Sequence, residues 1–244
     1  MPDLLGWLGL GVAALGASTL GGVAGFGAGV ILVPLVAWTL GAKATVPVLT
    51  VTMLLGNGAR VWFSRRDIHG RVVVAFFVGA LPTSALGAVV YAGLEGEWIS
   101  RLLGTFMLLA VPLRRWLAGR GVAIRLAHFP VIGAVFGFLS SLVGSVGPIM
   151  TPFFLGHGLR RGAYIGTEAL CTVGTYVARG IVFGRYALLT PSTVLVGLYL
   201  GGVSILGAWV GRRILERMSD RGFLALVEAL LVGLGGVFLL WPAR

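Results

Sequence analysis

Two Gly-rich breaks inside long apolar segments decide how this chain folds. The first lies in the stretch GGVAGFGAGVILVP at residues 21–34, and the second lies in GSVGPIMTP at residues 144–152. In both stretches a cluster of glycines precedes a short apolar run that ends in proline. Paired Gly/Pro interruptions at corresponding places in two halves of a membrane protein indicate the central binding site of a transporter.

The composition is that of an integral membrane protein. Hydrophobic residues make up 57% of the 244 residues and charged residues only 11%, whereas soluble domains carry about 25% charged residues. Beside the broken segments 4–41 and 129–158, six uninterrupted apolar stretches have about the length of a membrane-crossing helix: 44–63, 72–94, 98–113, 163–183, 190–211 and 221–241. We therefore expect an all-α polytopic membrane protein without a soluble domain. The continuous apolar runs exclude a β-barrel, whose strands alternate.

The charged residues exclude several other classes of protein. The formal net charge is +11, but the arginines cluster in short segments between apolar stretches, which is typical of cytoplasmic loops rather than of a nucleic-acid interface. The single cysteine, Cys171, rules out an intrachain disulfide and a cysteine-based metal cluster. No dinucleotide fingerprint, Walker loop or nucleophile–base pair is present. We expect no cofactor, no metal and no enzymatic activity.

The chain divides into two homologous membrane repeats, residues 1–120 and 121–244. Each repeat has one Gly-broken segment followed by three predicted transmembrane helices. The matching positions are 85–90 with 205–210, Gly56 with Gly174, and Ala59-Arg60 with Ala178-Arg179 after a one-residue slip. A repeat of this regularity predicts a pseudo-twofold architecture with a site between the halves.

The arginine distribution favours inverted over parallel halves. The loops at Arg65 and Arg212 are both predicted to be cytoplasmic, and the loop at Glu95 and Glu97 lies outside. The loop at Arg212 corresponds to the loop at Glu95, so equivalent loops lie on opposite sides of the membrane. Each broken segment then enters the membrane and returns as a re-entrant helical hairpin, which is tolerated where protein or a wet cavity shields it. The alternative is a chain of eight transmembrane helices without re-entrant hairpins, in which the two halves have the same orientation.

The glycine clusters predict an anion site. At each break a new helix begins with N–H groups that have no partner within the helix, and the helix dipole is positive there. Glycine lets a ligand approach this backbone closely. The candidate residues are Gly25, Gly27, Gly29, Gly144, Ser145 and Gly147. The alternative is that these glycines only allow tight helix packing.

Polar residues on two corresponding helices complete the candidate site. Arg60 and Arg179 lie within predicted membrane spans, where ionisable residues are functional by default. Both lie near helix ends, so snorkelling to the interface is the alternative. Asn57 and Thr175 follow the paired glycines and can donate hydrogen bonds to an oxyanion, or to a neighbouring helix.

Two carboxylates lie well inside predicted spans. Glu168 and Glu228 are candidates for carrying a coupling proton, as membrane carboxylates often do. The alternative is that they neutralise a buried arginine. Glu168 and Arg179 are three helical turns apart on one helix, which is too far for a direct pair.

At these motifs the chain resembles the sulfite exporter TauE/SafE family. The resemblance covers essentially the whole chain and is carried by Gly25-Phe26-Gly27-Ala28-Gly29 with Pro34 and by the segment 144–152, which departs from the usual pattern at Val146-Gly147-Pro148. It implies a multi-pass permease of the bacterial inner membrane for sulfite, a sulfonate such as sulfoacetate, or a related anion. A permease for another small anion and an anion channel are the alternatives. The expected partners are the anion and the lipid bilayer. The sequence leaves open whether the protein forms a homodimer.

Overall fold

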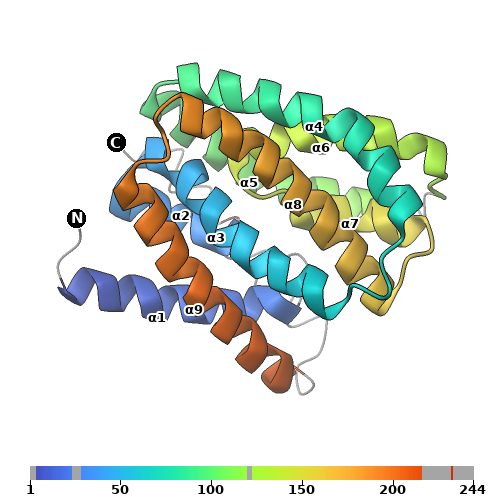
Figure 1. Cartoon of the computed structure of the whole chain (residues 1–244), viewed down its shortest axis with the longest axis horizontal. Coiled ribbons are helices and arrows are strands. Elements are labelled where there is room, and N and C mark those ends of the chain that lie inside the picture. Colours follow the sequence, from blue (N-terminus) through green and yellow to red (C-terminus); the bar gives the residue numbers. More distant parts are fainter. Residues whose placement is uncertain (1–3, 24–28, 120–122, 216–231, 233–244) are drawn as a thin grey trace.

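The structure is a computed structural model that describes residues 4–23, 29–119, 123–215 and 232. Its regular elements are all helical, which confirms the predicted all-α class for the described part of the chain (Figure 1). In chain order they are α1 (Leu4–Val23), α2 (Gly29–Leu40), α3 (Ala42–Phe63), α4 (Gly70–Gly93), α5 (Gly96–Gly119), the 3₁₀ turn η1 (Leu126–His128), α6 (Phe129–Val143), α7 (Gly147–Gly156), α8 (Arg161–Arg185) and α9 (Pro191–Leu215).

Three helical segments of the described chain have the length and composition to cross a bilayer. They are α3, α4 and the continuous run of η1 and α6 from Leu126 to Val143. The predicted stretches 98–113, 163–183 and 190–211 also form helices, α5, α8 and α9. In α8, Glu168 and Arg179 interrupt the apolar sequence but are almost fully buried, so the polar groups face protein. The predicted span 221–241 lies outside the described residues.

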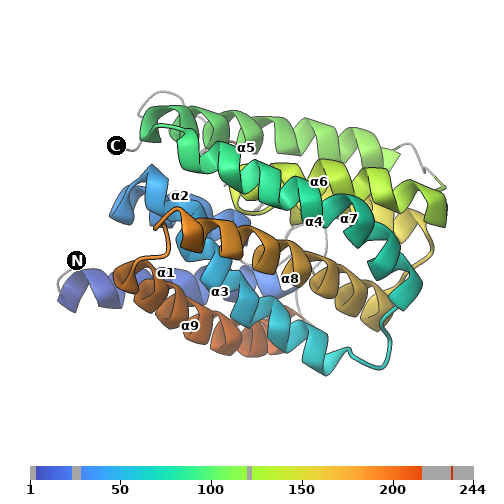
Figure 2. The same cartoon turned by 45° about the horizontal axis from the view of Figure 1, so that its top comes forward.

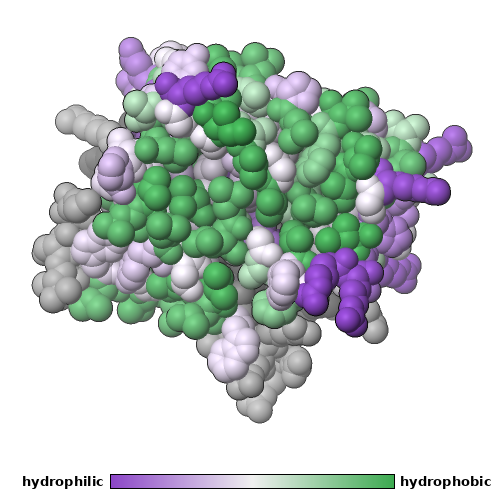
Figure 3. Space-filling view, in the orientation of Figure 1, coloured by the Kyte–Doolittle hydropathy of each residue, from purple (hydrophilic) through white to green (hydrophobic). Residues whose placement is uncertain are grey.

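The outer surface of the bundle suits lipid. On α4, Val74, Val78 and Leu81 recur at helical spacing and are exposed, while Phe76 and Ala80 between them are buried. Figure 3 shows apolar side chains covering most of the visible face, with hydrophilic residues gathered near its edges. This is the pattern of a helix bundle with a lipid-facing belt.

Two antiparallel helices, α3 and α8, form the centre of the bundle. Thr50, early in α3, accepts a hydrogen bond from Arg179, late in α8. Arg60, late in α3, pairs with Glu168, early in α8. Figures 1 and 2 show α4 and α6 on one side of this central pair and α9 and α1 on the other.

The two outer helix pairs make matching contacts. Ser141 of α6 donates from its hydroxyl to the Ser84 carbonyl of α4 at 2.9 Å, and Ser18 of α1 donates to the Ser204 hydroxyl of α9 at 2.9 Å. A Cβ on Gly87 of α4 would lie 2.7 Å from the Phe138 carbonyl. A Cβ on Gly207 of α9 would lie 2.9 Å from the Leu15 carbonyl. Small residues at equivalent places therefore let both pairs approach closely.

Basic side chains gather at one end of the bundle. Arg65, Arg66 and Arg71 are exposed around the connection from α3 to α4. The start of α8, with exposed Arg160, lies against this connection, because the His69 N–H donates to the Thr167 hydroxyl at 3.0 Å. In the view of Figure 3, hydrophilic side chains gather at the lower right, where α3 leads into α4 in Figure 1.

Lys43 marks the opposite end of the bundle. Its ammonium donates to the carbonyls of Ala92 at 2.7 Å, Tyr91 at 3.3 Å and Leu94, which end α4. A cation is favourable at this position because the C-terminal carbonyls of a helix carry partial negative charge. The exposed Glu95 and Glu97 follow directly in the chain.

The second Gly-rich break separates α6 from α7. Gly144 caps α6 with φ of 83°, a left-handed conformation that glycine adopts without strain. Val146 is the N-cap of α7, and Pro148 stands in its first turn, where a missing N–H is no loss. The predicted end of one helix and start of another at this place is therefore confirmed. In the first break, residues 24–28 lie outside the described part.

Candidate functional site

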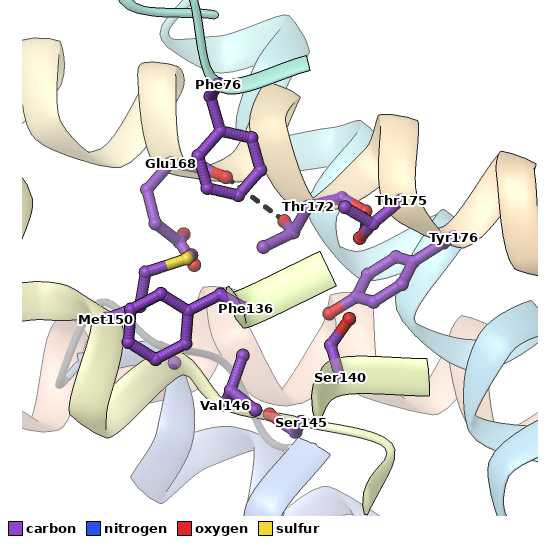
Figure 4. A pocket seen from close by; sticks show the side chains of 11 residues that line it. Phe76, Phe136, Ser140, Ser145, Val146, Met150, Glu168, Thr172, Thr175 and Tyr176 are labelled. Carbon is purple, nitrogen blue, oxygen red and sulfur yellow. Dashed lines mark hydrogen bonds between the residues drawn. The ribbon is translucent and has the colours of Figure 1, made fainter. Parts of the chain in front are cut away.

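A buried pocket lies where the break between α6 and α7 faces α8 and α4 (Figure 4). Its empty volume is about 300 Å³ when the space open to solvent is included. Apolar and polar side chains are mixed in its lining, and Glu168 lies beside Met150 (Figure 4). The lining residues are Phe76, Phe136, Ser140, Ser145, Val146, Gly147, Met150, Glu168, Thr172, Thr175 and Tyr176.

One face of α8 supplies most of the polar side chains. Glu168, Thr172, Thr175 and Tyr176 recur at helical spacing and are all buried. The Thr172 hydroxyl donates to the Ala169 carbonyl at 2.9 Å, and the Thr175 hydroxyl donates to the Thr172 carbonyl at 2.7 Å. These two hydroxyls therefore offer lone pairs rather than hydrogens to the pocket in this conformation.

The break supplies the hydrogen-bond donors. Within the residues that the structure describes, the backbone N–H groups of Ser145, Val146 and Gly147 donate to no protein oxygen. All three residues line the pocket and precede or begin α7, where the helix dipole is positive. Three consecutive free N–H groups at a helix N-terminus favour a bound anion.

Arg179 lies behind the pocket and holds the break in place. It is fully buried and donates to the Thr50 hydroxyl at 2.8 Å, to the Gly144 carbonyl at 3.3 Å and to the Ser140 carbonyl. Its guanidinium also lies 4.5 Å from the ring centre of Tyr176, which lines the pocket. Arg179 thus binds two carbonyls at the C-terminal end of α6, those of Ser140 and the C-cap Gly144, and its predicted direct contact with an anion stays a prediction.

Arg60 and Glu168 form a buried ion pair between α3 and α8. Arg60 Nη2 lies 2.9 Å from Glu168 Oε2, and Arg60 Nη1 donates to the Asn57 amide oxygen at 2.7 Å. The alternative that Glu168 neutralises a buried arginine is the arrangement observed, with Arg60 rather than Arg179 as the partner. Asn57 also donates to the Tyr176 hydroxyl at 3.4 Å, so it acts between helices in this conformation.

The two predicted glycine clusters approach each other through Gly29. A Cβ on Gly29, the first residue of α2, would lie 2.8 Å from the Ser145 hydroxyl oxygen and 3.2 Å from the Met53 sulfur. The start of α2 therefore lies against the second break. The predicted residues Gly25, Gly27 and Glu228 lie outside the described part of the chain.

Several lining residues were not predicted from the sequence as site residues: Phe76, Phe136, Ser140, Val146, Met150, Thr172 and Tyr176. For Thr172 and Tyr176 a signal was present, because they share a helix face with Glu168 and Thr175. For the residues of α4 and α6 no signal was present. Apolar side chains of membrane helices look alike in sequence whether they face lipid or a cavity.

Apolar helices around a buried, donor-rich pocket at a helix break define an integral membrane protein of the transporter class. The chain belongs to the sulfite exporter TauE/SafE family, whose model matches residues 10–238. This is a family of transporters. A search of curated proteins finds no match, and a search of solved structures finds none.

Proposed function

We propose that this protein is a secondary transporter that moves a small sulfur-containing anion, such as sulfite or the organosulfonate sulfoacetate, across the bacterial inner membrane. The observation that carries the proposal is the row of N–H groups at Ser145, Val146 and Gly147, which have no acceptor among the described residues and belong to residues that line a buried pocket. Family membership narrows the substrate to sulfur anions. Helix N-termini alone suit any small oxyanion.

Inverted halves explain how such a site opens alternately to both sides. The helices α3 and α8, which correspond in the proposed repeat, run antiparallel, and this supports an inverted relation of the halves. The matching contacts of α4 with α6 and of α9 with α1 support the same relation. In inverted-repeat transporters, rocking one half against the other exposes a central site first to one side and then to the other.

Both broken segments are re-entrant hairpins in this proposal. In the second half, α6 runs parallel to α4, because Gly79 lies against Pro130 and Gly87 lies against Ser141. By the same criterion α8 runs parallel to α4, because Gly166 lies against Ile68 and Gly174 against Phe77. Since α6 and α8 point the same way, α7 between them has to return the chain.

The proposal is tested by transport into proteoliposomes. We expect purified protein to take up labelled sulfite or sulfoacetate with saturation, and to exchange external label against internal unlabelled anion. Saturation with accelerated exchange identifies a carrier, whereas unsaturated flux without exchange identifies an anion channel. Transport of phosphate or acetate, but of no sulfur anion, would contradict the proposed substrate class.

A further inference from the structure

The pocket at the break offers hydrogen-bond donors and acceptors at different places. The N–H groups of Ser145, Val146 and Gly147 have no acceptor among the described residues, and these residues precede or begin α7. In Figure 4, Thr172 and Thr175 of α8 lie across the pocket from Ser145 and Val146. A ligand that fills the pocket therefore meets the break with one end and α8 with the other.

The two hydroxyl groups on the α8 side already use their hydrogens. Thr172 Oγ1 donates to the Ala169 carbonyl at 2.9 Å, and Thr175 Oγ1 donates to the Thr172 carbonyl at 2.7 Å. A hydroxyl that donates its one hydrogen to its own helix keeps its lone pairs. Both threonines can therefore accept a hydrogen bond from a ligand, whereas donating one would break a bond to their own helix.

Glu168 adds a carboxylate to the α8 side of the pocket. It lines the pocket and is almost fully buried. Its Oε2 lies 2.9 Å from Arg60 Nη2, without a well-aligned hydrogen bond. An ionised carboxylate has about four lone-pair sites, so the ion pair with Arg60 leaves Glu168 able to accept further hydrogen bonds. A second negative charge on a ligand would be repelled at this place.

Apolar side chains complete the lining. Phe76 of α4, Phe136 of α6 and Met150 of α7 all line the pocket. They offer no good partner to an oxyanion, but their contact with a hydrocarbon segment is favourable. A carbon chain therefore matches this part of the lining better than a bare inorganic oxyanion does.

We propose, building on the proposed transport function, that the preferred substrate is a sulfonate with one negative charge and a hydroxyl group at its other end. The sulfonate accepts hydrogen bonds from the N–H groups of the break, and the carbon chain contacts the apolar side chains. The hydroxyl donates to the acceptors on α8, which are Glu168 and Thr172.

The other end groups suit the α8 side less well. An ammonium group loses much of its hydration when it is buried, and it gains little in return because Arg60 already opposes the charge of Glu168. The carboxylate of sulfoacetate brings a second negative charge to Glu168 and has no hydrogen to donate. A methyl group neither donates nor repels. The expected order of affinity is therefore hydroxyl, then methyl, then carboxylate.

The test compares ligands that share one skeleton. Hydroxyethanesulfonate, ethanesulfonate, aminoethanesulfonate and sulfoacetate each carry a sulfonate on a short carbon chain and differ at the far end. Their binding to purified wild-type protein is measured at neutral pH by calorimetry. We expect hydroxyethanesulfonate to bind at least about tenfold more tightly than ethanesulfonate, because its hydroxyl donates to a charged acceptor in a buried site. Sulfoacetate should bind more weakly than ethanesulfonate, and labelled hydroxyethanesulfonate should exchange in proteoliposomes.

Two variants change the acceptors on α8. Thr172→Val has nearly the same shape but no hydroxyl, so we expect hydroxyethanesulfonate to lose about threefold to tenfold in affinity while ethanesulfonate is unaffected. Glu168→Gln presents an amide that can donate to a carboxylate, so the preference for hydroxyethanesulfonate over sulfoacetate should fall at least about tenfold. Because Thr172→Val leaves the ion pair with Arg60 intact, a folding defect in Glu168→Gln would not prevent the test.

Thr39→Val is the matched control for Thr172→Val. The Thr39 hydroxyl makes the same kind of hydrogen bond, to the Leu35 carbonyl at 2.8 Å, but at an exposed position of α2 outside the pocket lining. All four affinities should stay at their wild-type values in this variant.

The outcomes separate this inference from the transport proposal. Wild-type protein that neither binds nor moves any sulfur anion contradicts the transport function itself. Wild-type protein that moves sulfite or sulfoacetate, but binds hydroxyethanesulfonate no better than ethanesulfonate or does not exchange it, overturns this inference alone. Tighter binding of aminoethanesulfonate than of hydroxyethanesulfonate also overturns it, as does an unchanged order of affinity in both Thr172→Val and Glu168→Gln.

Discussion

At the scale of single residues, Arg179 is a buried cation whose hydrogen bonds go mainly to backbone carbonyls. Its guanidinium donates to the carbonyls of Ser140 and Gly144, which end α6, and to the Thr50 hydroxyl of α3. The Ser140 carbonyl also accepts the Gly144 N–H at 2.9 Å, whereas the Gly144 carbonyl lies past the end of α6, where a buried polar group without a partner would be costly. Arg179 therefore connects the central helix pair to the break that carries the N–H donors.

Replacing Arg179 is expected to destabilise the protein even when no anion is present. Arg179→Met keeps much of the apolar volume but removes every donor, so we expect a loss of about 3 kcal/mol and a clearly lower midpoint of thermal unfolding in detergent. Arg179→Lys should recover part of the loss, because an ammonium can still reach one carbonyl. If Arg179→Met unfolds at the wild-type temperature yet no longer binds sulfite, Arg179 contacts the anion directly.

The sequence predicted which residues are unusual but not their partners. Arg60, Arg179 and Glu168 stand out because charged residues are rare in membrane helices. Pairing depends on how two helices are aligned, and a single sequence does not contain that alignment. Spacing along one helix correctly excluded a pair between Glu168 and Arg179. The Arg60 partner became visible only once α3 and α8 lay antiparallel.

At the scale of elements, close helix packing depends on glycines that meet a neighbouring backbone. Gly87 of α4 faces the Phe138 carbonyl of α6, and Gly207 of α9 faces the Leu15 carbonyl of α1. Gly202, on the exposed side of α9, has no atom of the described residues within 4 Å of an added Cβ. Alanine substitutions at these three positions therefore distinguish the effect of helix packing on stability from the effect of intrinsic helix propensity.

Alanine at these glycines is expected to have opposite effects. Gly87→Ala and Gly207→Ala should each push two helices apart and cost about 1–3 kcal/mol, which outweighs the gain of about 0.5–1 kcal/mol from helix propensity. Gly202→Ala should leave stability unchanged or slightly raise it. The midpoints of thermal unfolding in detergent test these expectations. If Gly202→Ala is destabilised while Gly87→Ala and Gly207→Ala are unaffected, the proposed role of Gly87 and Gly207 in helix packing is contradicted.

Helix positions were largely predictable from the sequence, whereas the site was predictable only in part. Apolar length and the Gly/Pro pattern located α3, α4, α5, α8, α9 and the break between α6 and α7, because membrane-crossing length and missing side chains have direct sequence signatures. The apolar wall of the pocket, Phe76 and Phe136 among it, depends on which helix faces which neighbour. Nothing in the sequence around these residues encodes that choice.

At the scale of the whole molecule, the charges orient the bundle. Arg66, at the connection from α3 to α4, lies at the end rich in arginine, while Glu95 and Arg185 are exposed at or near the other end, where Lys43 contacts α4 and Tyr91 contacts Phe183. The positive-inside rule predicts that the arginine-rich end faces the cytoplasm. The connections after α3 and after α8, which correspond in the proposed repeat, lie at opposite ends of the bundle.

Cysteine labelling in intact cells tests this orientation. In a Cys171→Ala background, a membrane-impermeant maleimide should label Glu95→Cys and Arg185→Cys, and it should label Arg66→Cys only after the membrane is permeabilised. Labelling of Arg66→Cys and Arg185→Cys from the same side would contradict inverted halves. Because all three positions are exposed, differences in labelling report sidedness rather than burial.

The proposed anion site is tested most directly by measuring sulfite exchange in a variant whose pocket carries an added side chain. Gly147 lines the pocket at the start of α7, so Gly147→Val adds a branched side chain next to the backbone N–H groups that are proposed to bind the anion. Gly202→Val adds the same side chain at an open position of α9. We predict that wild-type protein and Gly202→Val exchange labelled sulfite alike. Gly147→Val, purified as folded protein, should exchange at least about tenfold more slowly, equivalent to about 1.4 kcal/mol. Unchanged exchange by Gly147→Val would contradict the assignment of this pocket as the anion site.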